Sequence, residues 1–375
     1  MSGIYIHVPF CKQRCAYCDF YTEVAPQFIE TYIDALVREF YLRKDYLPVA
    51  PVRSIYFGGG TPSVLSVAHF NRIFNAVSEL YKLDEDAEIT LEANPDDLTD
   101  AYLSEIASLP FERLSIGVQS FDDGDLKRIN RRHTSLQAIE AVRNAQKAGF
   151  MNISIDLIYG LPGQDLERWK KQLEQAFALK VQHISAYGLT YEEGTKLWRQ
   201  RAKGEVRATT DETMNEMYQL LLETVKNNGF EAYEISNFAK PGFRSRHNSS
   251  YWKQRPYIGL GPSAHSFDGV SRQWNVASIR KYTDALANNS PSFEREELTL
   301  FDRYNDYIMV SLRTSEGIDE AYIRLEFGKE LASYCLENIK RFIQTEKIYR
   351  LNGNFRLTTA GILISDHIIM TLMKV

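Results

Sequence analysis

Short apolar runs alternate with helical patterns along the first half of the chain. Apolar residues recur at three- and four-residue spacing over residues 28–47, which is typical of an amphipathic helix. Similar helical patterns cover 135–148 and 165–179, and each follows a short apolar run that indicates a buried strand. Strands that alternate with helices predict parallel βαβ units, so we expect an α/β fold class. The six expected strands begin at Ile4 and continue over 52–57, 88–92, 113–118, 152–158 and 183–189.

The pattern changes in the second half of the chain. A helix is expected over 212–227, then an apolar run over 230–235, and then an irregular segment rich in Pro, Gly and Ser. From residue 298 helices dominate, at 300–312, 318–327 and 331–345, and a last helix starts at Thr358. Between them, the pair Asn352-Gly353 separates two apolar runs, which is a hairpin signal. We therefore expect a large domain over 1–235, a connecting segment over 236–297 and a small α+β domain over 298–375.

Composition and charge limit the class of protein. Hydrophobic residues make up 44% of the 375 residues and charged residues 25%, as in ordinary globular proteins, and no apolar run approaches the roughly 20 residues that cross a bilayer. The net charge of -5 argues against nucleic acid as a partner. A local basic cluster at Lys127, Arg128, Arg131 and Arg132 is also typical of a solvated helix surface. We expect a soluble, cytoplasmic protein.

Three of the four cysteines, Cys11, Cys15 and Cys18, directly follow the first apolar run. Thiolates at Cys-x3-Cys-x2-Cys spacing can bind three irons of a 4Fe-4S cluster and leave the fourth iron open to an exchangeable ligand. A zinc site with His7 as fourth ligand is the alternative, and a disulfide framework is disfavoured because no secretory signal precedes the strand. Cys335 lies in a helical segment and is expected to be buried.

Polar residues and glycines stand near the ends of the expected strands. The chemistry of parallel barrels gathers at the carboxyl ends of their strands, where the loops meet. Glycines let a backbone approach a ligand closely, although three glycines after a strand are also typical of a tight turn. Taken singly, each polar residue is equally well an ordinary strand-end side chain. The residues concerned are Gly59, Gly60, Thr61, Glu92, Gln119 and Asp156.

The cysteine spacing, with Tyr17 directly before the third cysteine, resembles the radical S-adenosylmethionine (SAM) superfamily. The stretch Tyr5-Ile6-His7-Val8-Pro9-Phe10-Cys11 is similar to the branch that contains oxygen-independent coproporphyrinogen III oxidase and the haem chaperones called HemW. This resemblance implies a radical SAM partial (β/α)6 TIM-like barrel with a small C-terminal winged-helix-like α+β domain. It also implies that the open iron of the cluster chelates the amino and carboxylate groups of SAM.

The resemblance implies specific SAM contacts. Glu92 would hold the ribose hydroxyls, while Gln119 and Arg131 match a pair associated with a second SAM in the oxidase. The full set of implied SAM contacts is Tyr5, Tyr17, Gly59, Gly60, Thr61, Glu92, Gln119, Arg131 and Asp156.

Two departures separate the chain from the oxidase. Phe20 stands where the oxidase has a fourth cysteine, and only two residues precede Gly3, where the oxidase has an extension that helps to enclose its substrate. Both departures put coproporphyrinogen decarboxylation in doubt, and Asp19-Phe20 resembles the HemW family instead.

A motif near residue 250 indicates a binding site for a second cofactor. His247-Asn248-x-x-Tyr251-Trp252 is similar to the haem-binding motif of HemW, which implies that His247 is the axial haem ligand and that Tyr251 and Trp252 flank the porphyrin. On a helical turn His247 and Tyr251 would project from the same side. The alternative is that His247 hydrogen-bonds a loop while the two aromatic residues pack as core. His265 is a second candidate ligand.

The resemblance therefore implies a haem chaperone that carries a 4Fe-4S cluster and SAM and passes haem to acceptor proteins, respiratory ones among them. It leaves SAM cleavage, a homodimer and contact with a membrane surface open. The alternatives are a coproporphyrinogen III oxidase or another radical SAM enzyme acting on a tetrapyrrole, and a redox-sensing regulator that binds DNA. The last of these is disfavoured because Lys and Arg do not outnumber Asp and Glu after Leu300.

Overall fold

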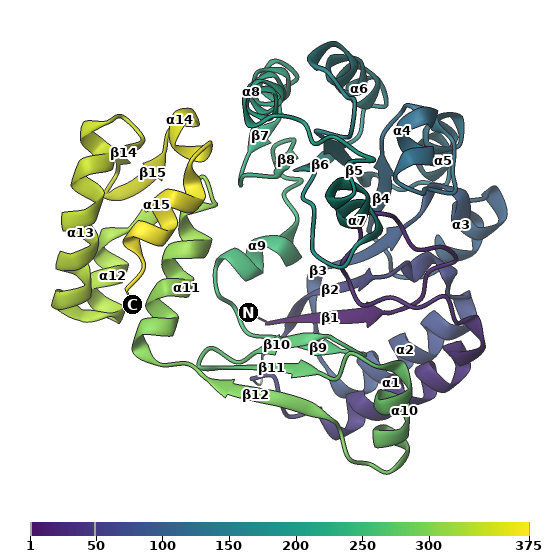
Figure 1. Cartoon of the computed structure of the whole chain (residues 1–375). Helices are drawn as coiled ribbons and strands as arrows, with labels where there is room; N and C mark the ends of the chain where they lie inside the picture. The colour runs from purple at the N-terminus through teal and green to yellow at the C-terminus, as the bar shows by residue number, and fades with distance from the viewer. Residues whose placement is uncertain (1, 49, 375) are drawn as a thin grey trace.

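The computed structural model describes residues 2–48 and 50–374. Its centre is a twelve-stranded sheet in the order β12-β11-β10-β9-β1-β2-β3-β4-β5-β6-β8-β7. The six strands from β1 to β6 are parallel neighbours in chain order, as the sequence predicts, and helices cover their outer face (Figure 1). The strands are β1 Ser2–Val8, β2 Val52–Gly59, β3 Leu83–Ala93, β4 Arg113–Gln119, β5 Asn152–Tyr159 and β6 His183–Gly188.

The helices of this unit confirm the predicted βαβ pattern, with small differences at their ends. The helix expected over 28–47 is α1, which ends at Leu42. Buried apolar side chains from the strands and from most of these helices form one continuous core. The helices are α1 Ile29–Leu42, α2 Val67–Leu80, α3 Asp100–Ile106, α4 Asp123–Arg128, α5 Ser135–Lys147, α6 Leu166–Ala178, α7 Lys196–Ala202 and α8 Asp211–Asn227.

Residues 236–297, expected as a connecting segment, extend both edges of the large sheet. On one edge β8 Asn237–Ala239 pairs antiparallel with β6, and β7 Glu231–Ala232 pairs with β8. On the other edge β9 Tyr257–Leu260 pairs parallel with β1. Outside β9 lie three antiparallel strands and one helix: β10 His265–Phe267, β11 Ser271–Asn275, α10 Ile279–Ala287 and β12 Phe293–Glu297.

Helix α9, Arg246–Trp252, crosses between these two edges and packs against β1 and β2. An irregular segment is expected over 241–252, and this expectation is wrong for its second half, which is helical. The Ser245 hydroxyl caps the helix by accepting the N–H of Asn248.

A small domain with its own apolar core follows β12 and lies beside α9, opposite the barrel helices (Figure 1). Its three-stranded sheet has the order β13-β15-β14, and Asn352 and Gly353 both have positive φ angles in the predicted hairpin. Cys335 is 1% exposed in this core, as expected. The segment expected as one helix over 318–327 begins instead with strand β13. The elements are α11 Leu300–Leu312, β13 Ile318–Asp319, α12 Glu320–Glu326, α13 Gly328–Gln344, β14 Ile348–Leu351, β15 Asn354–Leu357, α14 Thr359–Ile362 and α15 Ser365–Leu372.

None of the helices in the described chain combines the length and the apolar character that a membrane crossing requires.

Candidate functional site

The three cysteines lie half-buried on the loop that follows β1. Two polar side chains from other βα units reach this loop. The Thr61 hydroxyl donates to the Sγ atom of Cys11 at 3.4 Å, and the Nη1 atom of Arg131 donates to the Sγ atom of Cys15 at 3.4 Å. Burial raises the pKa of the Cys18 thiol to about 11 and also raises that of Cys11, with the neighbouring Cys15 adding to both shifts. These thiols therefore need a cationic partner to ionise at neutral pH.

His7 is not placed to act as the fourth ligand of a zinc site, because both of its ring nitrogens are engaged. Its ring is buried, with Nδ1 3.0 Å from the Tyr5 hydroxyl and Nε2 3.0 Å from the Tyr21 carbonyl oxygen. Within residues 2–48 and 50–374, no three His, Cys, Asp or Glu side chains converge as the ligands of a single metal ion do. A 4Fe-4S cluster instead takes its thiolates on separate irons, so the cysteine loop suits a cluster better than a mononuclear site.

Gly59 and Gly60 are required by the packing of β2 against the cysteine loop. Gly59 has a φ angle of +104°, and a Cβ atom there would lie 2.6 Å from the His7 ring. A Cβ atom on Gly60 would lie 2.7 Å from the carbonyl oxygen of Phe10. The N–H groups of Gly60 and Thr61 donate to the carbonyls of Val8 and Phe10, so they are not available to a ligand.

Two carboxyl groups lie on neighbouring parts of the inner sheet face. The Tyr56 hydroxyl donates to Oε1 of Glu92 at 2.6 Å, and burial raises the pKa of Glu92 to about 7. Burial also raises the pKa of Asp156, whose carboxylate accepts from the Ser115 hydroxyl at 3.3 Å. The charge of Asp156 adds to the raised pKa of Glu92, so this face of the barrel disfavours a second negative charge beside Asp156. Tyr5 lies beside this pair, with its ring stacked 6.3 Å from that of Tyr56.

Arg131 joins three of the predicted residues. Its Nη2 atom donates at 2.6 Å to the Gly117 carbonyl and at 2.6 Å to Oδ1 of Asn94. Asn94 in turn donates to the Thr61 hydroxyl at 3.3 Å, which links Cys11, Thr61, Asn94, Arg131 and Cys15. Sequence reasoning missed Asn94, although it stands two residues after Glu92. Gln119 ends β4 with a φ angle of +66°, and Tyr17 packs beside Ile129 and Leu161.

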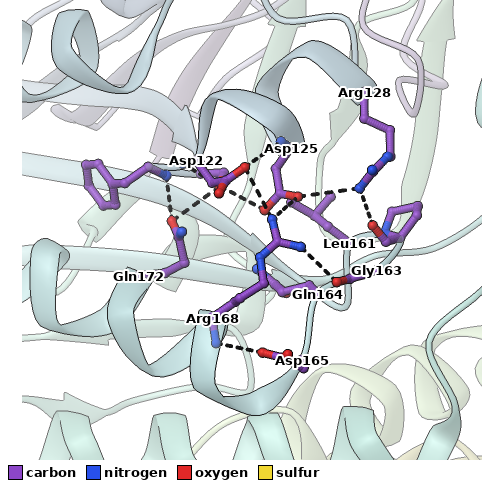
Figure 2. A network of polar contacts seen from close by, with 12 residues as sticks. Asp122, Asp125, Arg128, Leu161, Gly163, Gln164, Asp165, Arg168 and Gln172 are labelled. Carbon is purple, nitrogen blue, oxygen red and sulfur yellow. Dashed lines mark hydrogen bonds and ion pairs between the residues drawn. The ribbon is translucent and has the colours of Figure 1, made fainter.

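A polar network between α4, α6 and residue Gly163 stabilises the segment that carries Arg131 (Figure 2). The buried Asp125 carboxylate pairs with Arg168 of α6 at 2.9 Å, and Arg168 also donates to the Gly163 carbonyl at 2.7 Å. Past the end of α4, the Ile129 carbonyl accepts the N–H of Ala16, and the Asn130 side chain donates to the Arg14 carbonyl at 2.7 Å. The network therefore fixes both Arg131 and the cysteine loop.

The interpretation of the basic cluster as a solvated helix surface holds for the exposed Lys127, Arg128 and Arg132 and is wrong for Arg131. Arg131 is bonded to the cysteine loop, Arg128 donates to the Pro162 carbonyl, and Arg132 pairs with Asp96 at 2.9 Å.

His247 lies on the barrel side of α9 and is 1% exposed. Its Nδ1 atom is 2.9 Å from the Ser54 hydroxyl, its Nε2 atom is 2.8 Å from the Tyr251 hydroxyl, and its ring stacks on Tyr56 at 4.9 Å. Burial and then the Arg113 charge lower the pKa of His247 to about 3, so the imidazole is neutral. The predicted shared face of His247 and Tyr251 is confirmed. Both ring nitrogens are engaged, so the imidazole does not present a free ligand atom in this conformation.

Asn248 and Trp252, the remaining residues of the motif, make contacts separate from those of His247 and Tyr251. The Asn248 N–H serves the helix cap, and Trp252 faces the C-terminal domain, with the Arg313 guanidinium 5.9 Å from its ring centroid. His265 is exposed on β10 and stacks against Trp274 at 6.1 Å.

The chain is similar in sequence and in fold to known proteins. Residues 5–176 match the radical SAM superfamily, and residues 298–364 match the HemN C-terminal domain. Proteins called heme chaperone HemW from Lactococcus lactis and Bacillus subtilis are 33% and 32% identical over 98% of this chain, and the matches cover 96% and 98% of those proteins. The crystal structure of Escherichia coli coproporphyrinogen III oxidase (HemN) has a TM-score of 0.86 at 22% identity, covering 100% of this chain and 90% of that one. This last likeness shows a shared fold.

Proposed function

The chain belongs to the radical SAM superfamily and, within it, to the HemW family, and from this membership we propose that it is a haem chaperone that binds haem and passes it to acceptor proteins. The observation that carries the proposal is the match to heme chaperone HemW proteins over 98% of the chain. That match includes both the cysteine loop and α9, so the two candidate cofactor sites occur together in one chain.

The superfamily implies a 4Fe-4S cluster and SAM, and the described residues fit both groups. We propose that Cys11, Cys15 and Cys18 hold the cluster. When bound, the cluster supplies one-electron chemistry to SAM. Arg131 places a fixed positive charge beside the thiolates, and the Thr61 hydroxyl donates to one of them, so both side chains favour ionised sulfur.

Glu92 is proposed to accept the ribose hydroxyls of SAM. Its carboxylate already accepts the Tyr56 hydroxyl, which fixes its orientation. The remaining SAM contacts proposed on the same inner face and at the strand ends are Tyr5, Tyr17, Gly59, Gly60, Thr61, Gln119, Arg131 and Asp156.

We propose His247 as the axial ligand of haem iron, on the condition that Nε2 first leaves the Tyr251 hydroxyl. The two residues are one turn apart on the same face of α9, so a change in the side-chain conformation of Tyr251 alone would free Nε2. Asn248, Tyr251 and Trp252 complete the proposed haem segment.

We further infer that the protein resides in the cytoplasm and that its acceptors include haem-containing respiratory proteins. We also infer that it contacts a second copy of the chain. A second candidate function is the oxidative decarboxylation of coproporphyrinogen III, which the shared fold with the oxidase favours. Phe20, 62% exposed in place of the oxidase's fourth cysteine, argues against it.

One experiment separates the two functions. The purified protein, reconstituted with iron and sulfide, is titrated with haem and the same sample is incubated with SAM, reductant and coproporphyrinogen III. The chaperone proposal expects saturable haem binding and no protoporphyrinogen. Formation of protoporphyrinogen, or the absence of haem binding, would overturn it.

A further inference from the structure

A cleft of about 410 Å³ lies between α9 and the C-terminal domain. One wall is formed by the last turn of α9 and the residues after it, including Trp252, Lys253 and Arg255. The facing wall comes from α11 and α12 and includes Tyr307 and Tyr322. A volume of this size is within the range of small-molecule and cofactor sites.

The aromatic side chains of the cleft are held in place. The rings of Tyr307 and Tyr322 are 4.7 Å apart, and the Tyr307 hydroxyl accepts the N–H of Asp319 at 2.8 Å. Across the cleft, the indole Nε1 atom of Trp252 is buried and has no hydrogen-bond partner in the described part of the chain. A buried indole N–H usually finds an acceptor, so its lack of one indicates a ligand with an acceptor atom.

The charges of the cleft favour an anion. Its acidic side chains are already satisfied, because Glu316 pairs with Arg244 at 2.9 Å and Asp319 caps α12 by accepting the N–H of Ala321 at 2.8 Å. Lys253 and Arg255 are exposed, and neither side chain has an ion-pair partner among residues 2–48 and 50–374. Two unpaired cations beside aromatic walls suit a flat aromatic molecule that carries carboxylates.

We propose that this cleft holds the porphyrin ring of the haem, with its carboxylates on Lys253, Arg255 and the indole N–H of Trp252 and its face against the tyrosines of the facing wall. The inference rests on the proposed haem function and specifies where the ring is held. His247 lies on the opposite side of α9 from Trp252, so the cleft can hold the ring before iron ligation takes place. Metal-free protoporphyrin IX is therefore also expected to bind.

The test compares the affinities of haem and of metal-free protoporphyrin IX for the full chain. The variant Lys253→Glu with Arg255→Glu reverses both cations and is expected to weaken binding of both porphyrins by about tenfold. Lys170→Glu with Lys171→Glu makes the same change in net charge on exposed α6 positions and is expected to leave both affinities unchanged. If the reversed variant misfolds, judged by thermal unfolding, the neutral pair Lys253→Gln and Arg255→Gln replaces it.

The outcomes are distinguishable. If the wild-type chain binds both porphyrins and the cleft variant binds each as tightly as wild type does, the cleft assignment is wrong while the chaperone proposal stands. Binding of haem without any binding of metal-free protoporphyrin would also overturn the assignment, because the iron ligand alone would then account for affinity. If the wild-type chain binds neither porphyrin, the proposed function fails and the cleft assignment with it.

Discussion

The guanidinium of Arg131 lies 3.4 Å from the Sγ atom of Cys15, although the two residues are 116 positions apart in the sequence. The same guanidinium donates to the Gly117 carbonyl and to Asn94, both at 2.6 Å, so it is fixed by β4 and by the loop after β3. A positive charge is therefore built into the protein beside the cysteine loop.

We expect Arg131→Gln to lower the reduction potential of the reconstituted cluster. The reduced cluster carries more negative charge than the oxidised one, so removal of the cation costs the reduced form more stabilising electrostatic energy. A change in charge interaction on the order of 1 kcal/mol corresponds to a shift on the order of 40 mV for a one-electron couple. Spectroscopic redox titration measures it. Arg128→Gln, at the end of α4 three residues before Arg131 and bonded to the Pro162 carbonyl, is the matched control. Equal potentials in the Arg131 variant and wild type would show that the guanidinium does not act on the cluster.

Cys15→Ala is expected to abolish the broad iron–sulfur absorbance after anaerobic reconstitution. Among the four cysteines only Cys335 remains outside the loop, and it is buried in the core of the C-terminal domain, where it cannot replace a ligand. Cys335→Ala is therefore the control and should keep the full iron and sulfide content. Retention of both by the Cys15 variant would contradict the assignment of the cluster.

Glu92→Gln is expected to make the fold less dependent on pH. Because burial raises the pKa of Glu92 from 4.5 to about 7, the folded state binds more protons than the unfolded state between these values. The stability contributed by this group is therefore present below pH 4.5 and is lost as the pH rises to about 7, by up to about 3 kcal/mol. Urea unfolding at pH 5 and pH 8 measures the loss, which the variant should largely lack.

Asp156 keeps part of the pH dependence in that variant, because its own pKa is raised by burial. Glu105→Gln removes an exposed carboxylate and serves as the control, with the pH dependence of wild type. If Glu92→Gln shows the same difference between pH 5 and pH 8 as this control, the Glu92 carboxyl is not destabilised by burial.

The sequence predicts the barrel well because each βα unit is a local pattern. The strands and helices up to residue 227 have the predicted order, and Asn352-Gly353 forms the predicted turn. The cysteine loop was also evident, since its three thiols fall within eight positions. These features depend on neighbours in the chain and not on contacts between distant segments.

Helix α9 could not be predicted in this way. Asn248, Ser249 and Ser250 have low helix propensity, and the helix depends on a distant residue. The Glu88 carboxylate accepts the N–H groups of Arg246 at 3.1 Å and His247 at 3.0 Å, from about 158 positions away in the sequence. The burial of His247 and the contacts of Arg131 depend likewise on pairings that only the folded chain creates.

The hydrogen bond between His247 and Tyr251 allows a direct test of the proposed haem ligand. At 2.8 Å, the Tyr251 hydroxyl occupies the Nε2 atom that would bind iron. Tyr251→Phe removes this competitor but keeps the ring, which packs edge-on against Tyr257 at 4.6 Å. Freeing the imidazole from one hydrogen bond worth about 1 kcal/mol should tighten haem binding by about fivefold.

His247→Ala completes this test because it removes the ligand instead of its competitor. We expect its Soret band to shift and its haem affinity to fall, while cluster absorbance and SAM binding stay as in wild type. The substitution also leaves the Ser54 hydroxyl without its partner in the barrel floor, so thermal unfolding must show that the variant is folded before its spectra are interpreted. His265→Ala is the matched control, since His265 is exposed on β10 and its ring stacks against Trp274. If His247→Ala binds haem with an unaltered spectrum and His265→Ala does not, the iron ligand is on β10, and α9 serves to close the barrel.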